Sequence, residues 1–416
     1  MSNSVESGKS WKQIHRESKE LKKKYKDQNL EKKLEKRKQR EAVDQQKQQK
    51  QTTVAPVRSV STVSIAVPGS ILDNAQSQEL RTYLAGQIAR AACIFKVDEV
   101  IVFDDLGVNS STNPKRSRVE EINDDGEQIR HCCVQLARIL QYLECPQYLR
   151  KFFFPLHKDL KFSGLLNPLD APHHLRQQND FIYREGIVTN KPAKETKGSY
   201  VNIGLLNDCL VDKILNAGLR VTVKLDASQD LKSRKLKGVI VSPSEPRNDT
   251  GVYWGYTVRI AKSLSDVFLK SPYDNGYDLT IGTSDKGDSI HDVTAESLPY
   301  NHALIVYGGL QGLESALETD DKLDAEDPSL LFDHYLNTVP CQGSRTIRTE
   351  EAILISLASL QEKLQPQVKP KEFDLGESIP QSEDTGVKQL EHKMPKEKKE
   401  RQRIAPDVSG DMDRFD

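Results

Sequence analysis

Three glycine-bearing segments in the second half of the chain have the composition of ligand-binding loops. They cover residues 282–287, 308–314 and 337–352, and each follows a short hydrophobic run. Loops beyond the carboxyl ends of parallel strands bind ligands in α/β sheets, and glycine lets the backbone offer its N–H and C=O groups at close range. Each segment alone is also compatible with an ordinary strand-to-helix turn. The sequence has neither a Gly-x-Gly-x-x-Gly nor a Gly-x-x-x-x-Gly-Lys-Ser/Thr run, which disfavours the classical dinucleotide and nucleoside triphosphate folds.

Two arginines and a glutamate are the candidates for catalysis. Arg90 lies in the first quarter of the chain, and Arg345 and Glu350 belong to the third glycine-bearing segment. A guanidinium can hold a phosphate or a base carbonyl through two hydrogen bonds and can stabilise negative charge as a proton leaves. The alternative for Arg90 is a helix-surface ion pair. The alternative for Glu350 and Glu351 is a pair of first-turn acids at a helix N-terminus capped by Thr349.

The histidines and cysteines do not predict a metal site. His173 and His174 are adjacent, so their side chains point in different directions, and no third ligand is spaced nearby. The six cysteines include no Cys-x-x-Cys pair, which argues against both a zinc site and a disulfide framework. We therefore expect reduced thiols that lie mostly in the core, and we expect Cys341 to pack within the third segment.

The elements that must position these residues begin with a βαβ unit. A β-branched run at 62–67 predicts a strand, and apolar residues recur every three or four positions over 80–95, which predicts a helix capped by Ser77. The run 100–103 is apolar on both faces, as in a parallel strand covered by helices. With a second amphipathic helix around residues 136–143, this pattern predicts an α/β domain.

Residues 181–270 have a different texture, with short β-rich runs separated by turn signals. There are roughly five such runs, the last at 252–258, which is the strand count of a small β-barrel. Tyr253, Trp254 and Tyr256 in the last run are candidates for stacking on bases from a barrel face. Alternation places Tyr253 opposite Trp254, so the alternative for at least one of them is a place in the core. Because α/β texture resumes afterwards, we expect the barrel to be an insertion that splits one α/β domain.

Charge is divided unequally along the 416 residues. The formal net charge is -1, yet residues 1–50 hold 16 Lys and Arg against 8 Asp and Glu, so the remaining 366 residues sum to -9. Basic arms of this kind bind nucleic acid or direct nuclear import. The longest nearly apolar stretch, 352–360, is far shorter than the roughly 20 residues that cross a bilayer, and no secretory signal opens the chain. We expect an intracellular protein without membrane association.

Residues 61–362 resemble the SPOUT class of S-adenosylmethionine-dependent RNA methyltransferases, closest to its eukaryotic and archaeal branch with an inserted oligonucleotide-binding (OB-like) barrel. The similarity lies in segments 67–74, 85–92 and 165–176 and in the three glycine-bearing segments. It implies a deep trefoil knot, a rare exception to the rule that chains do not thread loops, and two subunits paired about that knot. The expected boundaries are a basic, mostly disordered or helical arm (1–58), the first part of the α/β domain (59–180), the inserted barrel (181–270), the knotted part (271–364) and a disordered tail (365–416).

The resemblance also implies which residues bind S-adenosylmethionine. In relatives, the second and third segments wrap the cofactor with backbone amides and carbonyls, and apolar side chains such as Leu310, Val339 and Ile347 suit the faces of adenine. The expected cofactor-binding residues are Gly282, Thr283 and Lys286 of the first segment, Gly308, Gly309 and Gly312 of the second, and Asn337, Thr338, Gly343 and Ile347 of the third.

The same resemblance suggests the reaction. Arg90 resembles an arginine that many SPOUT enzymes place shortly after the first strand. Residues 345–350 resemble the run Arg-Ile-Leu-Arg-x-Glu of bacterial ribosomal-RNA uridine-N3 methyltransferases, from whose pattern Thr346 and the following Glu351 depart. A cation beside the weakly acidic uridine N3–H favours the N3 anion. We therefore expect methylation of a base in ribosomal RNA, with uridine N3 as the favoured acceptor and Arg90, Arg345 and Glu350 as catalytic residues.

A second hypothesis is a protein of another class. It is a non-catalytic RNA-binding or scaffold protein with the same fold, nuclear and associated with the mitotic spindle or kinetochore. For either hypothesis the expected partners are RNA and a second copy of the chain. The expected location is the nucleus, including the nucleolus, with cytoplasmic or spindle pools.

Overall fold

A six-stranded parallel sheet forms the centre of the molecule. The computed structural model describes residues 59–107, 119–122, 128–191, 198–226, 229, 231, 233, 235–323, 325 and 327–372, so the arm predicted at 1–58 lies outside the described residues. The strand order is β10-β2-β1-β13-β11-β14, and every neighbouring pair is parallel. The strands are β1 (Thr62–Pro68), β2 (Glu99–Phe103), β10 (Thr257–Ala261), β11 (Leu279–Ser289), β13 (His302–Tyr307) and β14 (His334–Asn337).

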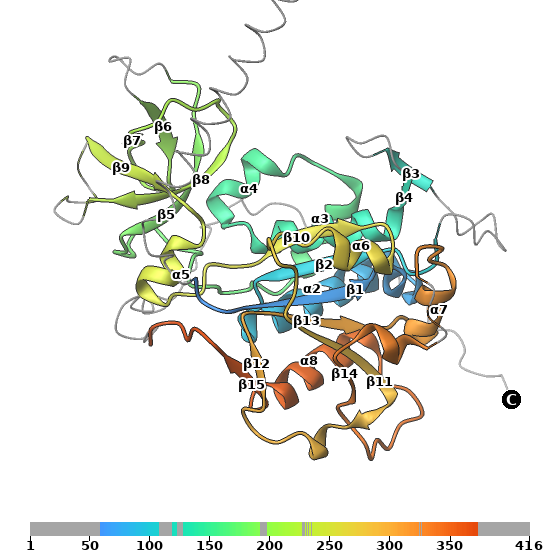
Figure 1. Ribbon diagram of the computed structural model, residues 1–416. Coiled ribbons are helices and arrows are strands. Elements are labelled where there is room, and N and C mark those ends of the chain that lie inside the picture. Colours follow the sequence, from blue (N-terminus) through green and yellow to red (C-terminus); the bar gives the residue numbers. More distant parts are fainter. Residues whose placement is uncertain are drawn as a thin grey trace, which may run out of the picture.

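Helices cover both faces of this sheet (Figure 1). Along β1, Ile65 and Val67 face one helical layer, whereas Ala66 between them faces the other, because successive side chains of a strand point to opposite sides. The first layer contains α2 (Gln78–Ile94), α3 (His131–Glu144) and α8 (Thr349–Leu360), and the second contains α6 (Leu264–Leu269) and α7 (Gly312–Glu318). This arrangement confirms the prediction of a parallel α/β domain.

The predicted βαβ unit is β1, α2 and β2. The Ser77 side chain accepts a hydrogen bond from the Leu80 N–H at 3.2 Å, so the predicted cap of α2 is confirmed. Leu84 and Ile88 are buried, but Leu80 is 52% exposed because it lies in the first turn, before the helix reaches the core. The predicted apolar face is therefore correct except at its start.

A closed five-stranded barrel stands at one side of the sheet (Figure 1), which confirms that part of the prediction. Its order is β5-β6-β7-β9-β8, with one parallel pair, β7 and β9. The strands are β5 (Tyr183–Val188), β6 (Ser199–Asn202), β7 (Cys209–Val211), β8 (Arg220–Leu225) and β9 (Leu236–Val241). α4 (Gln147–Phe153) precedes the barrel, and α5 (Glu245–Thr250) follows it.

The run 252–258 is not a barrel strand, so this prediction is wrong. After the barrel the chain returns to the sheet, where β10 pairs with β2, and the short β7 supplies the fifth barrel strand instead. The three aromatic residues of the run are buried. Tyr253 donates to the Val97 carbonyl at 2.6 Å, and Tyr256 donates to the Leu140 carbonyl at 3.0 Å. They anchor the returning chain and are not available to stack on bases.

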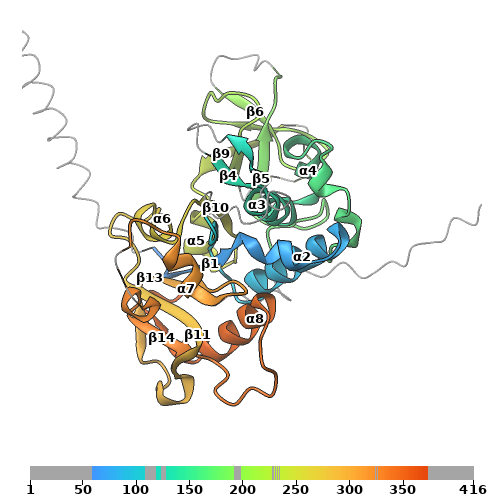
Figure 2. The ribbon, with the colours of Figure 1, turned by 90° about the vertical axis from the view of Figure 1, so that its right-hand side faces the viewer.

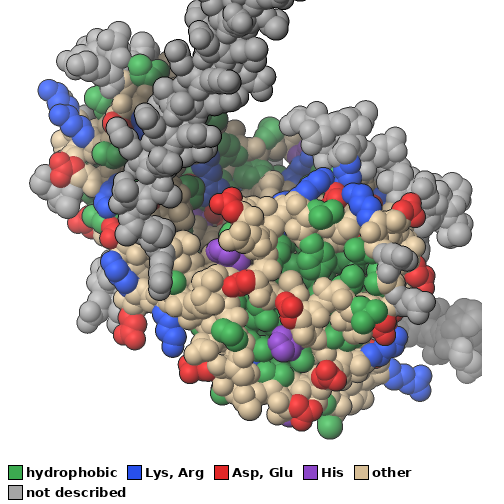
Figure 3. Space-filling view, viewed as in Figure 1, with side chains coloured by type: hydrophobic (Ala, Val, Ile, Leu, Met, Phe, Trp, Pro, Cys, Tyr) green, Lys and Arg blue, Asp and Glu red, His purple; other side chains and the backbone are tan. Residues whose placement is uncertain are grey.

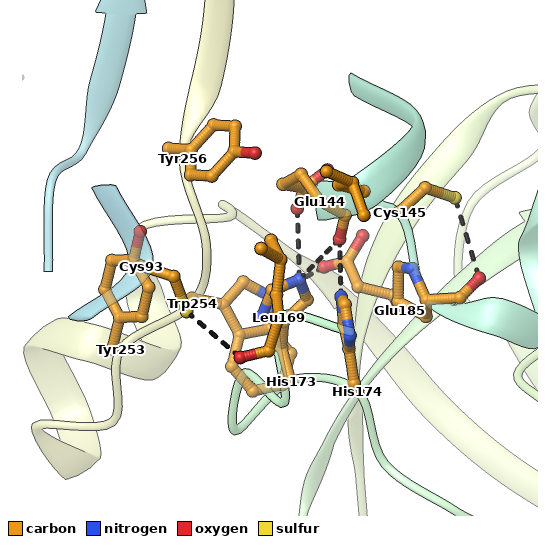
Figure 4. Close-up of polar contacts among 12 residues, drawn as sticks. Cys93, Glu144, Cys145, Leu169, His173, His174, Glu185, Tyr253, Trp254 and Tyr256 are labelled. Carbon is orange, nitrogen blue, oxygen red and sulfur yellow. Dashed lines mark hydrogen bonds and ion pairs between the residues drawn. The ribbon is translucent and has the colours of Figure 1, made fainter. Parts of the chain in front are cut away.

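A buried polar cluster joins the barrel to the sheet domain (Figure 4). His173 and His174 both direct Nε2 at the Glu144 carbonyl oxygen, at 2.9 and 2.6 Å, and Trp254 lies beside His173. Arg220 of β8 makes two hydrogen bonds to the Glu144 carboxylate, at 2.6 and 2.9 Å. The two histidines therefore fix the segment that leads into the barrel. Among the described residues, no group of three or more His, Cys, Asp or Glu could hold a metal ion.

Ordered structure continues beyond the predicted start of the C-terminal tail at residue 365. β15 (Leu364–Pro366) pairs with β12 (Leu298–Tyr300), and the Val368 carbonyl accepts from the Ser61 N–H at 3.0 Å. The tail prediction is wrong for these residues, because they complete hydrogen bonds along the edge of the domain. Residues 373–416 lie outside the described part.

A second small pair of strands, antiparallel, consists of β3 (Val119–Ile122) and β4 (Gln128–Arg130).

The surface shows charged and apolar side chains mixed together (Figure 3), and the cysteines are free thiols. In Figure 3, acidic, basic and apolar side chains are interspersed on the face shown. All six cysteines are free, and four of them are buried, whereas Cys341 is exposed, so its predicted packing is wrong. Within the described ranges, no helix has the length and hydropathy needed to span a membrane.

Candidate functional site

The three glycine-bearing segments meet at the carboxyl edge of the sheet. The Thr349 hydroxyl donates to the Gly308 carbonyl at 3.0 Å and so joins the third segment to the second. The Asn337 amide donates to the Asp285 carbonyl at 2.9 Å and joins the third segment to the first. Parallel strands place their carboxyl ends at one edge, which is why segments far apart in sequence come together.

The second segment is a tight turn between β13 and α7. The Gly312 N–H donates to the Gly309 carbonyl at 3.1 Å, and Gly312 has a φ of +77°, a conformation that favours glycine. A Cβ atom on Gly308 would lie 2.8 Å from the carbonyl carbon of Gly312. The turn therefore requires these glycines, while Leu310 at its tip is 77% exposed.

Gly309 lies against Ser70 and Asp105, which the sequence reasoning missed. A Cβ on Gly309 would lie 2.8 Å from the Asp105 carboxylate and 3.2 Å from the Ser70 hydroxyl. Ser70 donates to Asp105 through its hydroxyl at 2.5 Å and through its backbone N–H at 3.3 Å. Both residues follow parallel strands, β1 and β2, so their position at the ends of hydrophobic runs is the signal that could have identified them.

Two buried aspartates give this part of the site its electrostatics. Burial raises the pKa of Asp104 to about 6, although the Leu106 and Gly107 N–H groups donate to its carboxylate and Arg130 lies 4.0 Å away. Burial also raises the pKa of Asp105, against the hydrogen bond from the Ser70 hydroxyl. Both carboxyls are therefore easier to protonate than exposed aspartates.

The first segment is not a loop, contrary to the prediction. β11 runs through it, with a register irregularity between Thr283 and Asp288 where the chain bulges away from β14. A Cβ on Gly282 would lie 2.5 Å from the Phe332 ring, and the Thr283 hydroxyl donates to the Val306 carbonyl at 3.1 Å. Gly282 and Thr283 are thus engaged in packing. The exposed Lys286 pairs with Glu314 of α7 at 2.6 Å.

The third segment is exposed and offers backbone groups. Asn337 holds its beginning by accepting from the Val339 N–H at 2.9 Å. In the described chain, the N–H groups of residues 343–347 make no hydrogen bond to another backbone group. A Cβ on Gly343 would meet nothing within 4 Å. Thr338, Gly343 and Ile347 therefore lie on a strip of backbone that a ligand can reach.

Arg90 and Glu350 line one cavity of about 310 Å³ between α2 and α8. Arg90 donates to the Leu169 carbonyl at 2.5 Å, and in the described part of the chain it forms no ion pair. Tyr83, Gly86 and Leu354 also contribute to the walls. Figure 2 shows α2 and α8 side by side, which places the first candidate arginine beside the end of the third segment.

The remaining charged candidates lie at the start of α8. Glu350 and Glu351 are in its first turn, as the structural alternative predicted, and Glu351 accepts from the Arg348 N–H at 3.0 Å. Arg348, not Thr349, is the N-cap residue, because α8 begins at Thr349, whose hydroxyl donates to the Gly308 carbonyl. Arg345 is exposed, and its guanidinium makes no hydrogen bond or ion pair with any described residue.

Comparison with known proteins assigns this arrangement to a family. Residues 62–360, more than two thirds of the chain, match the model of the family described as "Putative RNA methyltransferase". The chain belongs to this family. Its members are SPOUT-type enzymes, so the expected resemblance is confirmed and the chain is an RNA methyltransferase.

Three relatives share most of the chain. A 28S rRNA (uridine-N(3))-methyltransferase of Drosophila melanogaster is 59% identical over 382 residues, covering 91% of this chain and 78% of the relative. Proteins of the same name from Mus musculus and Homo sapiens are each 57% identical over 301 residues. These alignments cover 72% of this chain and 76% and 78% of the relatives.

The site of this methyltransferase fits a methyl donor that is held by backbone groups. The crowded glycines 308 and 309 leave no room for side chains, and residues 343–347 of the loop that Thr349 joins to Gly308 have N–H groups without a backbone partner among the described residues. Such a donor set recognises the edges of a heterocycle and a carboxylate without needing fixed charges. The structure thus brings together the second and third predicted segments. Gly282 and Thr283 of the first segment instead contact Phe332 and the Val306 carbonyl.

Proposed function

We propose that the chain uses S-adenosylmethionine to methylate N3 of a uridine in ribosomal RNA. The observation that carries the proposal is the hydrogen bond between Thr349 and Gly308, which holds the two exposed glycine-bearing loops together at the carboxyl edge. The names of the relatives, all 28S rRNA (uridine-N(3))-methyltransferases, supply the substrate class and the acceptor atom. Those names do not favour a non-catalytic scaffold.

The two loops suit an adenosine bound through backbone contacts. Residues 308–312 supply close-packed glycine backbone, and residues 343–347 supply N–H groups for the polar edge of adenine. Leu310 and Val339, on opposite loops, would cover its apolar faces. We assign Gly308, Gly309, Gly312, Asn337, Thr338, Gly343 and Ile347 to this role, with Lys286 at the rim beside Glu314.

The acceptor requires a positive charge and a fixed orientation. When bound, S-adenosylmethionine supplies an electrophilic methyl group, which the acceptor must approach nearly in line with the breaking bond. Arg345 is exposed and unpaired with any described residue, so its guanidinium can stabilise the N3 anion of uridine. Arg90 remains beside Glu350 in the cavity, where it can orient the RNA strand.

We propose that two chains pair through the face formed by α2 and α8. Large apolar side chains on this face are exposed, whereas such residues on a monomer are normally scattered. They are Leu80, Tyr83, Ile94 and Leu354. Because the Arg90 cavity opens between the same helices, pairing would bring one subunit's arginine close to the other's loops. Light scattering after gel filtration tests this dimer, and a monomer at micromolar concentration would contradict it.

We propose that the chain also has the OB-like barrel and the trefoil knot that the family resemblance implies. The barrel order with one parallel pair, β7 and β9, supports an OB-like barrel that contacts RNA. The hydrogen bonds from α8 back to Tyr307 and Gly308 support a trefoil-knotted C-terminal part.

We also propose a nuclear location that depends on the basic residues of 1–50. Imaging of a fluorescent fusion that lacks residues 1–50 would test this location.

Two measurements test the reaction. Isothermal titration should detect S-adenosylmethionine binding, and mass spectrometry of ribosomal RNA from cells that lack the protein should show loss of one 3-methyluridine. Restoring the wild-type gene should return the modification, whereas restoring the Arg345→Ala variant should not. Absence of cofactor binding by folded protein, or an unchanged modification profile, would contradict the proposal.

A further inference from the structure

Residues 151–162, between α4 and the segment that enters the barrel, form a surface rich in aromatic and basic side chains. We call them the aromatic–basic segment. Phe152 is 44% exposed and Leu156 is fully exposed, which is unusual for large apolar side chains so close together. Three lysines of the segment, Lys151, Lys158 and Lys161, are also exposed. Apolar and positively charged groups therefore share one surface.

The single acidic residue of this segment, Asp159, does not lie on the surface. Asp159 is buried, where Arg138 donates to its carboxylate and His131 and His157 each lie at 3.3 Å. This ion cluster attaches the segment to α3 and neutralises its negative charge. The exposed charges of the segment are consequently all positive, although Glu79 of α2 lies within electrostatic range of Lys161. The surface thus complements a polyanion.

The lysines are held next to aromatic rings. The Lys151 ammonium lies 4.9 Å from the centre of the Phe152 ring, and the Lys161 ammonium lies 5.1 Å from the centre of the Phe162 ring. Single-stranded nucleic acid is bound by this pairing of groups, because bases stack on aromatic faces while cations contact the adjacent phosphates. A duplex, whose bases are already stacked, gains only the phosphate contacts.

The segment leads directly to the cavity that contains Arg90. It is followed by the short helix η3 (Ser163–Leu165) and by Leu166, which lines that cavity. A Cβ on Gly86 of α2 would lie 2.8 Å from the Leu166 side chain, so the two elements are in contact. In Figure 2, α4 lies between the barrel and α2 on the same side of the molecule. A strand bound along the segment can therefore reach the cavity.

We infer that the aromatic–basic segment is a docking surface for single-stranded RNA next to the nucleotide to be methylated. The inference rests on the proposed action on RNA and adds a binding site outside the barrel. Phe152 and Leu156 contact bases, and Lys151 contacts a phosphate. The unpaired strand is thereby held beside α2, and it reaches the methylation site through the cavity.

The test measures RNA affinity of the full chain by fluorescence anisotropy, with oligouridine and with a duplex of equal length as probes. The double variant Phe152→Ser, Leu156→Ser should weaken binding of oligouridine about 10-fold and leave duplex binding nearly unchanged. Lys151→Ala should weaken both and lower the dependence of affinity on salt. The matched control is Leu269→Ser on α6 across the sheet, because Leu269 is 73% exposed, between Phe152 and Leu156, and this variant should behave as wild type.

Catalysis and crosslinking supply independent readouts. With an unstructured RNA substrate, the double variant should raise KM about 10-fold with kcat and S-adenosylmethionine affinity unchanged. Crosslinking with 4-thiouridine RNA should label a peptide that contains residues 151–162. If the double variant binds oligouridine as tightly as the wild type does, the inference is overturned. The same result is expected if the surface binds a protein partner instead of RNA. If the wild type methylates RNA but the variants bind it normally, the segment inference fails while the proposed function stands.

Discussion

The Thr349 hydroxyl donates a hydrogen bond to the Gly308 carbonyl at 3.0 Å, across two loops separated by 41 residues. This contact links the turn after β13 to the first residue of α8. It fixes the distance between the two backbone surfaces that are proposed to enclose the cofactor. Elsewhere the two loops are held by different partners, the second by packing of Gly309 against Asp105 and the third by the hydrogen bond from Asn337 to the Asp285 carbonyl.

Thr349→Val should weaken S-adenosylmethionine binding about fivefold, since a typical hydrogen bond contributes about 1 kcal/mol. Isothermal titration measures this change. Ser359→Ala is a matched control, because Ser359 is on the same helix but donates within it, to the Ile355 carbonyl at 3.0 Å. Equal losses in the two variants would show a general effect on α8 instead of loop coupling.

Gly309→Ala should lower the free energy of unfolding by roughly 1–3 kcal/mol, the usual range for overpacking. The added Cβ would lie 2.8 Å from the Asp105 carboxylate, which is buried and held by Ser70. Urea denaturation measures the loss. Gly343→Ala has open space around the new Cβ and should unfold as wild type does. A fully stable Gly309→Ala variant would mean that the turn can shift away from Asp105.

Arg345→Ala should reduce kcat by about 100-fold, comparable to removal of one group that stabilises developing negative charge. Because the guanidinium makes no hydrogen bond or ion pair with a described residue, folding and cofactor affinity should not change. Single-turnover methyl transfer and titration calorimetry separate these effects. Arg345→Lys keeps the charge and should recover part of the rate. A parallel loss of cofactor affinity would indicate that Arg345 shapes the loop.

Deprotonation of Asp104 should lower the free energy of unfolding as the pH rises. Its folded pKa, about 6, is above the ordinary value of 3.8, so the folded state holds the proton more tightly than the unfolded state. The contribution of Asp104 to the free energy of unfolding is then fully present below about pH 4 and is lost as the pH rises through about 6, by on the order of 3 kcal/mol. Urea denaturation across this range should show a smaller decline for Asp104→Asn. Identical pH profiles would contradict the assignment.

Glu144 and Arg220 should act as a unit that attaches the barrel. Burial alone would raise the pKa of Glu144, but the hydrogen bonds from Arg220 and His173 outweigh burial and lower that pKa to about 2. The stabilisation is present above about pH 4.5 and is lost as the pH falls toward 2. Arg220→Met removes the guanidinium that contacts the buried carboxylates of both Glu144 and Glu185 and should cost about 3–5 kcal/mol at neutral pH.

The double variant Glu144→Leu, Arg220→Met removes this pair and should recover part of that loss, because the buried Glu185 also loses Arg220 at 2.8 Å but keeps its hydrogen bonds from Thr222 and Trp254. Denaturation followed by the fluorescence of Trp254 reports on this region, because its indole lies 5.9 Å from the His173 ring. Additive losses in the two single variants would mean that the two residues do not cooperate.

Local patterns in the sequence determined the elements of the α/β domain. The spacing of Leu84 and Ile88 predicted the buried face of α2, and Ser77 predicted its cap, because both signals act within a few residues. The glycines at 308, 309 and 312 predicted a turn that needs bare backbone. These features depend on covalent geometry and short-range sterics, which are the same wherever the segment lies.

Contacts between distant segments were decided only by the tertiary structure. The aromatic run at 252–258 satisfies every local criterion for a barrel strand, yet Tyr253 and Tyr256 bury their rings against the sheet domain, where their hydroxyls reach the Val97 and Leu140 carbonyls. Asp105 carries no special motif and gains its role from the approach of Gly309, some 200 residues later. Sequence spacing predicts which faces are apolar, but the partner of each face is selected by the packing of the whole chain.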